Sequence, residues 1–196
     1  MGKMIAIFLH MITKLTQNNW IVAATLAFFL TMSPAVADEA ELDALFERLQ
    51  QDVLPEHEEI ESKIWKIWSS SGSDSIDLLL SRGRKALDDE DLVAAIEHFT
   101  AVIDHAPDFA EGYNMRATAY YLSGMIGPSL ADVEITLALN PRHYGALSGL
   151  GTMLVEMGRE KEALKAYRAA QALNPHRKDV IEAVATLQAR VGERDI

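Results

Sequence analysis

A proline recurs in this chain at a fixed interval of 34 residues, at Pro107, Pro141 and Pro175. Each of these prolines closes an apolar segment with helical spacing, which a proline cannot continue. Other columns keep the same interval: Leu79, Tyr113 and Leu147; Gly83, Ala117 and Gly151; Ala86, Tyr120 and Leu154; Ala95, Ser129 and Ala163; Phe99, Val133 and Tyr167. A fixed period of this length predicts stacked helical repeats, which present a surface rather than enclose a reaction chamber.

Each repeat contains two apolar helical stripes joined by a short turn around Glu90, Gly124 or Gly158. The first stripe carries a small residue at its middle, where a glycine costs about 0.5–1 kcal/mol relative to alanine. That cost is understandable if a second helix must approach closely at this point. Small residues of the second stripe are followed four positions later by large ones, so we expect small side chains to pack against large ones between the two helices.

The pattern resembles the tetratricopeptide repeat family over residues 76–177. The residues that carry the resemblance are Arg82-Gly83, Ala94-Ala95-Ile96 and Phe99 in the first unit, Ala119-Tyr120-Tyr121 and Asn140-Pro141 in the second, and Leu150-Gly151, Tyr167 and Asn174-Pro175 in the third. The chain departs from the family pattern at Ala86, Ser129, Val133 and Thr136. The resemblance implies an all-α tetratricopeptide-repeat solenoid of three helix pairs, 76–109, 110–143 and 144–177, stacked into a right-handed superhelix with a concave groove.

The segments on either side of the repeats have helical patterns of their own. Residues 38–75 are predicted to form an acidic N-terminal helical hairpin and linker, because two apolar stripes flank Pro55 and a Ser-rich stretch follows them. The stripes consist of Leu42, Leu45, Phe46, Leu49 and Val53, and of Ile60, Ile64, Ile67 and Trp68. This hairpin is interpreted as an N-terminal cap or a docking element. Residues 178–196 are predicted to form a C-terminal capping helix, with Val180, Val184, Leu187 and Val191 on its apolar face.

The N-terminus, residues 1–37, has the pattern of a secretory signal peptide. Residues 20–32 are almost entirely apolar, Lys3 and Lys14 precede them, and Ala35-Val36-Ala37 has the form of a cleavage site. The chain has no cysteine, which excludes disulfides and thiol chemistry. An exported chain of this kind fits a bacterial envelope, most simply the periplasm. An anchor that is not cleaved remains an alternative, as does a translation start at Met11.

The net charge excludes two classes of partner. Removal of residues 1–37 would take away two lysines and no acid, and the formal charge would change from −11 to −13. Nucleic acid and anionic membrane surfaces are therefore poor partners, apart from the export signal itself. Residues 38–61 hold ten acids and one base. This excess is either a solvated helix face or a surface that attracts a basic partner.

The resemblance also implies a binding groove, formed by one face of each first helix. The residues carried over to that face are Asp77, Leu80, Arg84, Leu87 and Asp88 in the first unit, Glu111, Asn114, Thr118, Tyr121 and Leu122 in the second, and Gly145, Ser148, Thr152, Val155 and Glu156 in the third. Of these, the predicted groove residues are Leu80, Arg84, Leu87, Asn114, Thr118, Tyr121, Ser148, Thr152 and Val155. Some family members clamp a terminal carboxylate with several basic and amide side chains, but here only Arg84 and Asn114 could do so. The groove is thus expected to be mildly apolar and to bind an amphipathic helix or an extended segment, with Tyr121, Leu87 and Arg84 as anchors. Alternatively, some of these side chains pack under neighbouring helices, or the hairpin covers them.

No pattern in the sequence predicts catalysis, a metal or a cofactor. The six histidines include no pair spaced four apart on one helix, and Asp88–Asp91 lacks the spaced ligands and glycine of a calcium loop. We therefore expect no catalytic residue, no metal site and no cofactor, and a protein or peptide as partner. The predicted function is a non-enzymatic protein–protein interaction module or scaffold of the bacterial cell envelope. The alternatives are a self-associating structural protein and, as a further class, a small-ligand binder or enzyme; the oligomeric state is left open.

Overall fold

A computed structural model describes residues 34–51 and 53–194 of the chain. It divides into two compact units, residues 1–41 and residues 42–196. Most of the predicted signal peptide, residues 1–33, lies outside the described residues, and so does the alternative start at Met11. Within the part that is described, no helix combines the length and the apolar character needed to cross a membrane.

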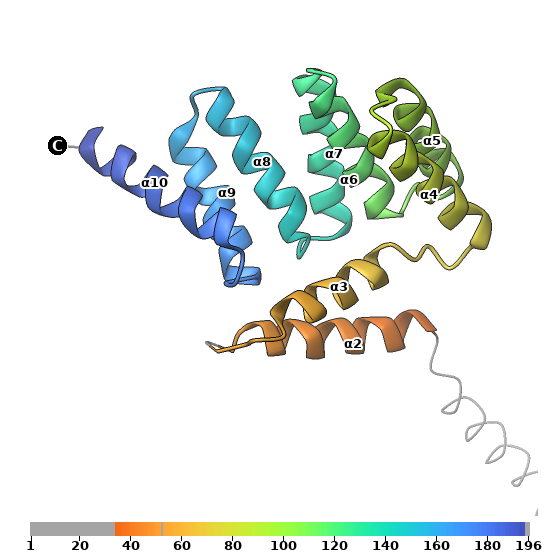
Figure 1. Ribbon diagram of the computed structural model, residues 1–196, viewed down its shortest axis with the longest axis horizontal. Helices are drawn as coiled ribbons and strands as arrows, with labels where there is room; N and C mark the ends of the chain where they lie inside the picture. Colours follow the sequence, from red (N-terminus) through yellow and green to blue (C-terminus); the bar gives the residue numbers. More distant parts are fainter. Residues whose placement is uncertain (1–33, 52, 195–196) are drawn as a thin grey trace, which may run out of the picture. The chain divides into compact units, whose positions relative to one another are not determined.

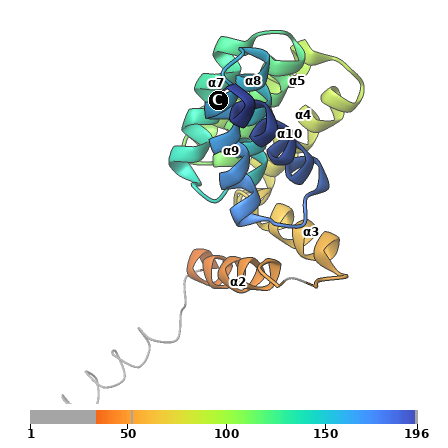
Figure 2. The ribbon, with the colours of Figure 1, turned by 90° about the vertical axis from the view of Figure 1, so that its left-hand side faces the viewer.

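The described residues form helices only. Their bounds are α2 (Pro34–Leu49), α3 (His57–Trp68), α4 (Asp74–Asp88), α5 (Leu92–His105), α6 (Ala110–Leu122), α7 (Ile126–Leu139), α8 (Tyr144–Glu156), α9 (Glu160–Leu173) and α10 (Lys178–Arg194). Helices α4 to α9 form three pairs, α4 with α5, α6 with α7 and α8 with α9, and the pairs stand next to one another (Figures 1 and 2). The second helices begin at Leu92, Ile126 and Glu160, at the 34-residue interval of the sequence. The expected all-α architecture of three helix pairs is therefore confirmed.

The turn inside each pair has the same backbone geometry. Glu90, Gly124 and Gly158, which are 34 residues apart, have φ angles of 60°, 73° and 71°. In the first turn Glu90 N donates to Leu87 O and Asp91 N donates to Ala86 O, at 3.0 and 2.8 Å. These two bonds satisfy carbonyl groups at the end of α4 in a Schellman motif, and the other two turns repeat them. Each turn therefore requires one residue with a positive φ angle. In the first turn this residue is a glutamate.

The expected packing of small against large residues holds the two helices of each pair together. A Cβ atom built at Gly83 would lie 2.7 Å from Phe99 Cδ1, and one built at Gly151 would lie 2.7 Å from Tyr167 Cε2. In the middle pair Ala117 and Val133 share one core cluster, so a larger residue on the first helix accompanies a smaller one on the second. The departure of Val133 from the family pattern is thereby explained, because an aromatic ring would need a glycine opposite.

The N-terminal hairpin packs on the third pair and on α10. Its buried residues Leu49, Ile60 and Ile64 belong to one core cluster with Tyr144 and Val180. Side-chain hydrogen bonds support this arrangement, with Gln50 Nε2 donating to Ala172 O at 3.2 Å and His176 Nε2 lying 2.9 Å from Leu49 O. The core of the hairpin is shared with the C-terminal half of the repeat array.

In the flanking segments one apolar residue is exposed against expectation, whereas the apolar face of α10 is buried as expected. Val53 was expected on the apolar stripe of the hairpin but is 82% exposed, whereas its neighbour Leu54 is buried. The reason is that α2 ends at Leu49, so the helical spacing no longer applies at Val53. In α10 the expected apolar face is present, with Val180, Val184 and Leu187 buried.

Candidate functional site

The first helices of the three pairs, α4, α6 and α8, position the residues predicted for a groove. Thr118 is exposed, and five others are partly exposed: Arg84, Leu87, Tyr121, Thr152 and Val155. Leu80, Asn114 and Ser148 are buried, with 1%, 8% and 8% of their surface exposed. Leu80 packs in a core cluster with Phe99, so it is a packing residue rather than part of an open groove.

The buried polar members of that set are engaged inside the protein. Asn114 Nδ2 donates to Glu111 Oε2 at 3.0 Å, and Ser148 Oγ donates to Tyr144 O at 2.9 Å. These side chains satisfy neighbouring groups and are not available to a ligand in this arrangement. The alternative interpretation, in which some groove residues pack under neighbouring helices, describes Leu80, Asn114 and Ser148.

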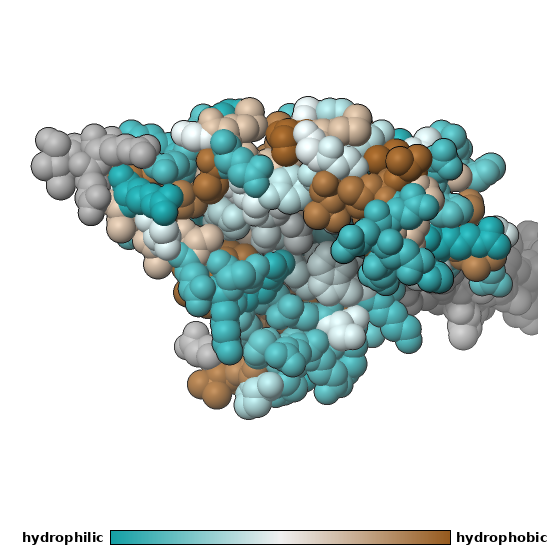
Figure 3. All heavy atoms as spheres, turned by 45° about the horizontal axis from the view of Figure 1, so that its top comes forward, coloured by the Kyte–Doolittle hydropathy of each residue, from teal (hydrophilic) through white to brown (hydrophobic). Residues whose placement is uncertain are grey.

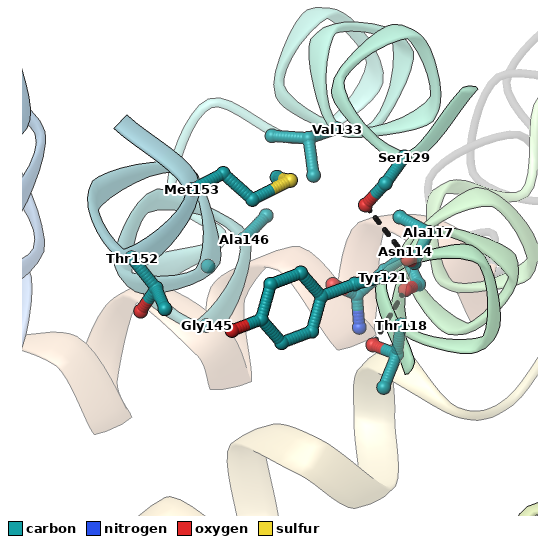
Figure 4. A pocket seen from close by; sticks show the side chains of 11 residues that line it. Asn114, Ala117, Thr118, Tyr121, Ser129, Val133, Gly145, Ala146, Thr152 and Met153 are labelled. Carbon is teal, nitrogen blue, oxygen red and sulfur yellow. Dashed lines mark hydrogen bonds between the residues drawn. The ribbon is translucent and has the colours of Figure 1, made fainter. Parts of the chain in front are cut away.

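A small pocket of about 100 Å³ lies between α6 and α8. Four of the predicted groove residues line it, namely Asn114, Thr118, Tyr121 and Thr152, together with Ala117, Ser129, Val133, Gly145, Ala146, Gly149 and Met153. Figure 4 shows the ring of Tyr121 reaching from α6 toward α8, with Val133 and Met153 above it in this view. The sequence pattern therefore located most of one side of this small pocket, but not its apolar base.

Most of the polar side chains that line the small pocket are already hydrogen-bonded within the chain. Thr118 Oγ1 donates to Asn114 O at 3.0 Å, and Ser129 Oγ donates to Ala117 O at 2.8 Å. Thr152 Oγ1 lies 3.2 Å from Ser148 O and 2.9 Å from the Tyr167 hydroxyl. What the pocket offers to a ligand is consequently apolar surface.

Tyr121 closes one side of the small pocket through a contact between repeats. Its hydroxyl donates to Glu156 Oε1 at 2.5 Å, and this hydrogen bond raises the pKa of the Tyr121 hydroxyl above its ordinary value. Exposed apolar side chains continue from Tyr121 to the turn ends of the pairs, where Leu122, Met125 and Met157 are 55%, 44% and 47% exposed. Figure 3, in which the top of Figure 1 is brought forward, shows brown, hydrophobic patches between teal, hydrophilic areas on the face that it presents.

A second, larger pocket of about 840 Å³ lies between the hairpin helix α3 and the helices α4 and α6. Its lining consists of Ser62, Trp65, Lys66, Ser69, Ser70, Asp77, Arg84, Glu111 and Met115. Arg84 was predicted as an anchor, whereas the contribution of α3 was not foreseen. Unlike the small pocket, this one combines charged side chains with an indole ring and a methionine.

A buried carboxylate, Glu111 of α6, connects α4 with the residue that precedes α8 at the floor of the large pocket. Its Oε1 accepts from Arg84 Nη2 at 2.7 Å, and its Oε2 lies 3.1 Å from His143 Nε2. His143 Nδ1 accepts from Ala146 N at 3.0 Å, so the ring proton is on Nε2, which donates to Glu111. Both Glu111 and His143 are fully buried, with 1% and 0% exposure, and each oxygen of the carboxylate has a donor. The resemblance placed Glu111 on the groove face, but the sequence carried no signal that pairs Glu111 with His143.

The hairpin covers the start of α8 with two tryptophans. The ring of Trp68 stacks on His143 with centroids 4.5 Å apart, and Trp65 meets the same ring edge-on at 5.3 Å. A Cβ built at Gly145 would lie 2.8 Å from Trp65 Cη2, so glycine is required there for the indole to fit. The hairpin thus occupies part of the predicted groove, while the two pockets stay open beside it.

Among the described residues, no group of three or more histidine, cysteine, aspartate or glutamate side chains is arranged to hold a metal ion. Two of the charged side chains at the large pocket, Arg84 and Glu111, are paired with each other, and Asp77 accepts from Ser71 of the linker. Lys66, which also lines this pocket, is exposed. The arrangement can therefore bind an apolar side chain in one pocket and a polar one in the other.

Comparison with known proteins gives one relative that matches along most of both chains and others that match over a shorter segment. No protein-family model matches the chain. A TPR repeat-containing protein of Rhizobium etli is 32% identical over 184 residues, which cover 85% of this chain and 90% of that protein. The human protein SGT1 homolog is 33% identical over 89 residues, which are 45% of this chain and 24% of that protein. This second relative therefore matches the chain over about a quarter of its own length.

Solved structures of the same fold include domains from several proteins. The first TPR of Spaghetti (RPAP3) bound to an HSP90 peptide is 21% identical with a TM-score of 0.57, covering 60% of this chain and 93% of that one. The Sgt2 TPR domain of Aspergillus fumigatus is 24% identical with a TM-score of 0.58, covering 63% and 83%. MamA is 18% identical with a TM-score of 0.56, covering 81% and 84%. At these sequence identities the similarity shows a shared fold, that is, the same arrangement of helix pairs.

Proposed function

The chain belongs to the family of TPR repeat-containing proteins, and from that premise we propose that it is a protein-interaction module that binds a polypeptide segment beside α6 and α8. The observation that carries this proposal is the small pocket, whose polar side chains are largely hydrogen-bonded within the chain and whose remaining surface is apolar. Two structural neighbours support a peptide as ligand, namely the first TPR of RPAP3 bound to an HSP90 peptide and the TPR2B domain of yeast Sti1 in complex with pHsp70.

The size of the small pocket limits what can enter it. At about 100 Å³ it is smaller than the ~150 Å³ cavity that accommodates a benzene ring. An aliphatic side chain such as that of valine, leucine or isoleucine is the group that fits this volume and this apolar lining. Burial of one such side chain contributes roughly 1.5–3 kcal/mol, which is enough to anchor a segment whose other contacts are weak.

We further propose that the protein acts in the bacterial cell envelope, as a scaffold that holds one partner polypeptide. The support comes from the sequence, in which Lys3 and Lys14 precede an apolar stretch and Ala35-Val36-Ala37 follows it. Fractionation of cells that express the full chain tests this part. Recovery in the periplasmic fraction in a shortened form supports export with cleavage, recovery in the membrane fraction at full length supports the anchored alternative, and recovery in the cytosol contradicts both.

Substitution at Gly149 tests the pocket directly. Gly149 lines the pocket, and a Cβ built there meets no atom within 4 Å, so a side chain can begin at this position and we expect a leucine to occupy the pocket. Gly127 on α7 is equally open and does not line the pocket, which makes Gly127→Leu the matched control. The probe is a random dodecamer peptide library displayed on phage, from which peptides are selected on the wild-type chain and then synthesised.

The expected result is a selected motif with one aliphatic position, whose peptides bind Gly149→Leu at least about 10-fold more weakly than wild type. Gly127→Leu is expected to bind them as wild type does. If no peptide is selected, or if both variants bind the selected peptides equally well, the proposed function fails.

A further inference from the structure

Trp65 stands between the two pockets of the candidate site. On one side its ring contacts Gly145, which lines the small pocket between α6 and α8. On the other side Trp65 itself lines the large pocket, next to Lys66 and opposite Arg84. A single indole from the hairpin therefore forms a partition, and a ligand that uses both pockets has to pass around it.

This partition is held firmly in place. The neighbouring residues of α3 that face the repeats, Ile60, Ile64 and Trp68, are 0%, 0% and 8% exposed. The Trp65 ring is itself held edge-on against Trp68 and Tyr144, with centroid distances of 5.3 and 5.9 Å. Because α3 shares its core with the third pair, the tryptophan is a fixed wall of the site and not a loose cover.

The two pockets differ in the chemistry that they leave unused. At the large pocket both oxygens of Glu111 are occupied, and Asp77 Oδ1 accepts from Ser71 N and Ser71 Oγ at 2.8 and 2.6 Å. Arg84 makes both of its hydrogen bonds through Nη2, to Glu111 and Ser69, which leaves Nε and Nη1 as donors. The ammonium group of Lys66 has no ion pair within the described part of the chain. Donors that are not used thus predominate over acceptors in this pocket.

We propose that Trp65 is a specificity-determining residue, and that it selects a partner segment in which an aliphatic side chain and an acidic side chain straddle the indole. The aliphatic side chain enters the pocket at Gly149, and the acidic side chain meets Lys66 and the free donors of Arg84. This inference rests on the proposed function, because it names the pattern of the segment that the same surface binds.

Two substitutions separate the parts of this proposal. Lys66→Glu reverses the charge at the exposed end of α3 and leaves the core untouched, and Lys165→Glu on the exposed face of α9 reverses a charge away from both pockets. Trp65→Ala removes the partition itself; circular dichroism and thermal unfolding of the full chain show whether this variant folds. All proteins are used to select from the same dodecamer library, fused to phage through the peptide C-termini so that no free terminal carboxylate is present.

Wild type and Lys165→Glu are expected to select one aliphatic and one acidic position at a fixed spacing. Lys66→Glu is expected to keep the aliphatic position, to lose the acidic one, and to bind wild-type peptides about fivefold more weakly. Trp65→Ala is expected to lose the fixed spacing. An acidic position that persists in Lys66→Glu overturns the proposal, and so does an unchanged spacing in a folded Trp65→Ala. These outcomes are distinct from failure of the proposed function, which shows as peptides that ignore Gly149→Leu.

Discussion

The ring of Phe99 on α5 occupies the space that a side chain at Gly83 on α4 would need. A Cβ at position 83 would lie 2.7 Å from Phe99 Cδ1, a distance that real Cβ contacts do not show. Both residues are buried, so neither can move into solvent to relieve the contact. Glycine at position 83 therefore allows α4 and α5 to pack together with the ring of Phe99 between them.

The first prediction concerns this pair. Gly83→Ala is expected to lower the free energy of unfolding by about 1–3 kcal/mol, because overpacking outweighs the gain in helix propensity. Urea denaturation measures the change. In the double variant Gly83→Ala, Phe99→Val, which copies Ala117 and Val133 of the middle pair, the loss is expected to be smaller than the sum of the two single losses. Additive losses would show that the two residues do not interact as described.

A second prediction concerns the turn after α4. Glu90 has a φ angle of 60°, in the left-handed region that favours glycine, whereas the matching turns have Gly124 and Gly158. Glu90→Gly is therefore expected to raise the free energy of unfolding by about 1 kcal/mol. Gly124→Ala is expected to lower it by a similar amount. A fall in stability for Glu90→Gly, measured in the same denaturation experiment, would mean that the glutamate side chain stabilises the turn in some other way.

A third prediction concerns the buried carboxylate. Glu111→Ala removes the acceptor of Asn114 Nδ2 and of His143 Nε2, and it leaves these buried donors without a partner. The expected loss of unfolding free energy is about 3 kcal/mol. Glu156→Ala, which removes an exposed carboxylate that accepts from the Tyr121 hydroxyl, is the control and is expected to change stability by less than about 1 kcal/mol. Equal losses in the two variants would contradict the account of the network.

The fourth prediction concerns alkaline pH. Burial is the largest cause that raises the pKa of the Tyr144 hydroxyl above its ordinary value of about 10. The unfolded chain therefore releases this proton near pH 10 while the folded chain retains it, so the contribution of Tyr144 to stability is complete below pH 10 and is lost as the pH rises above it. Tyr144→Phe is expected to lessen the fall in stability between about pH 9.5 and 11. A fall as steep as in wild type would refute the assignment.

Much of the fold follows from the periodic part of the sequence. The interval between Pro107, Pro141 and Pro175 predicted the three helix pairs, and the matched columns predicted that small residues pack against large ones between the helices. In the structure these contacts include Gly83 with Phe99 and Gly151 with Tyr167. Contacts inside one repeat could be predicted because equivalent positions of the three repeats face each other in the same way.

The candidate site was only partly predictable, because it depends on residues that occur once. Trp65 belongs to the hairpin, and nothing in its own helix shows that it lies against Gly145, 80 positions further along the chain. The buried pair of Glu111 and His143 is likewise unique to its place in the array. Periodicity also cannot tell which members of a helix face are exposed, which is why Leu80 was assigned to the groove although it is buried.

The most direct test of the account uses methionine methyl groups as reporters. Met153 lies in the small pocket with 2% exposure, whereas Met125 and Met157 are 44% and 47% exposed at the turns. In a chain labelled with ¹³C at its methionine methyl groups, addition of a selected peptide is expected to shift the Met153 signal and to leave the Met125 and Met157 signals in place. Binding that shifts Met125 or Met157 while Met153 stays unchanged would contradict a partner segment anchored between α6 and α8.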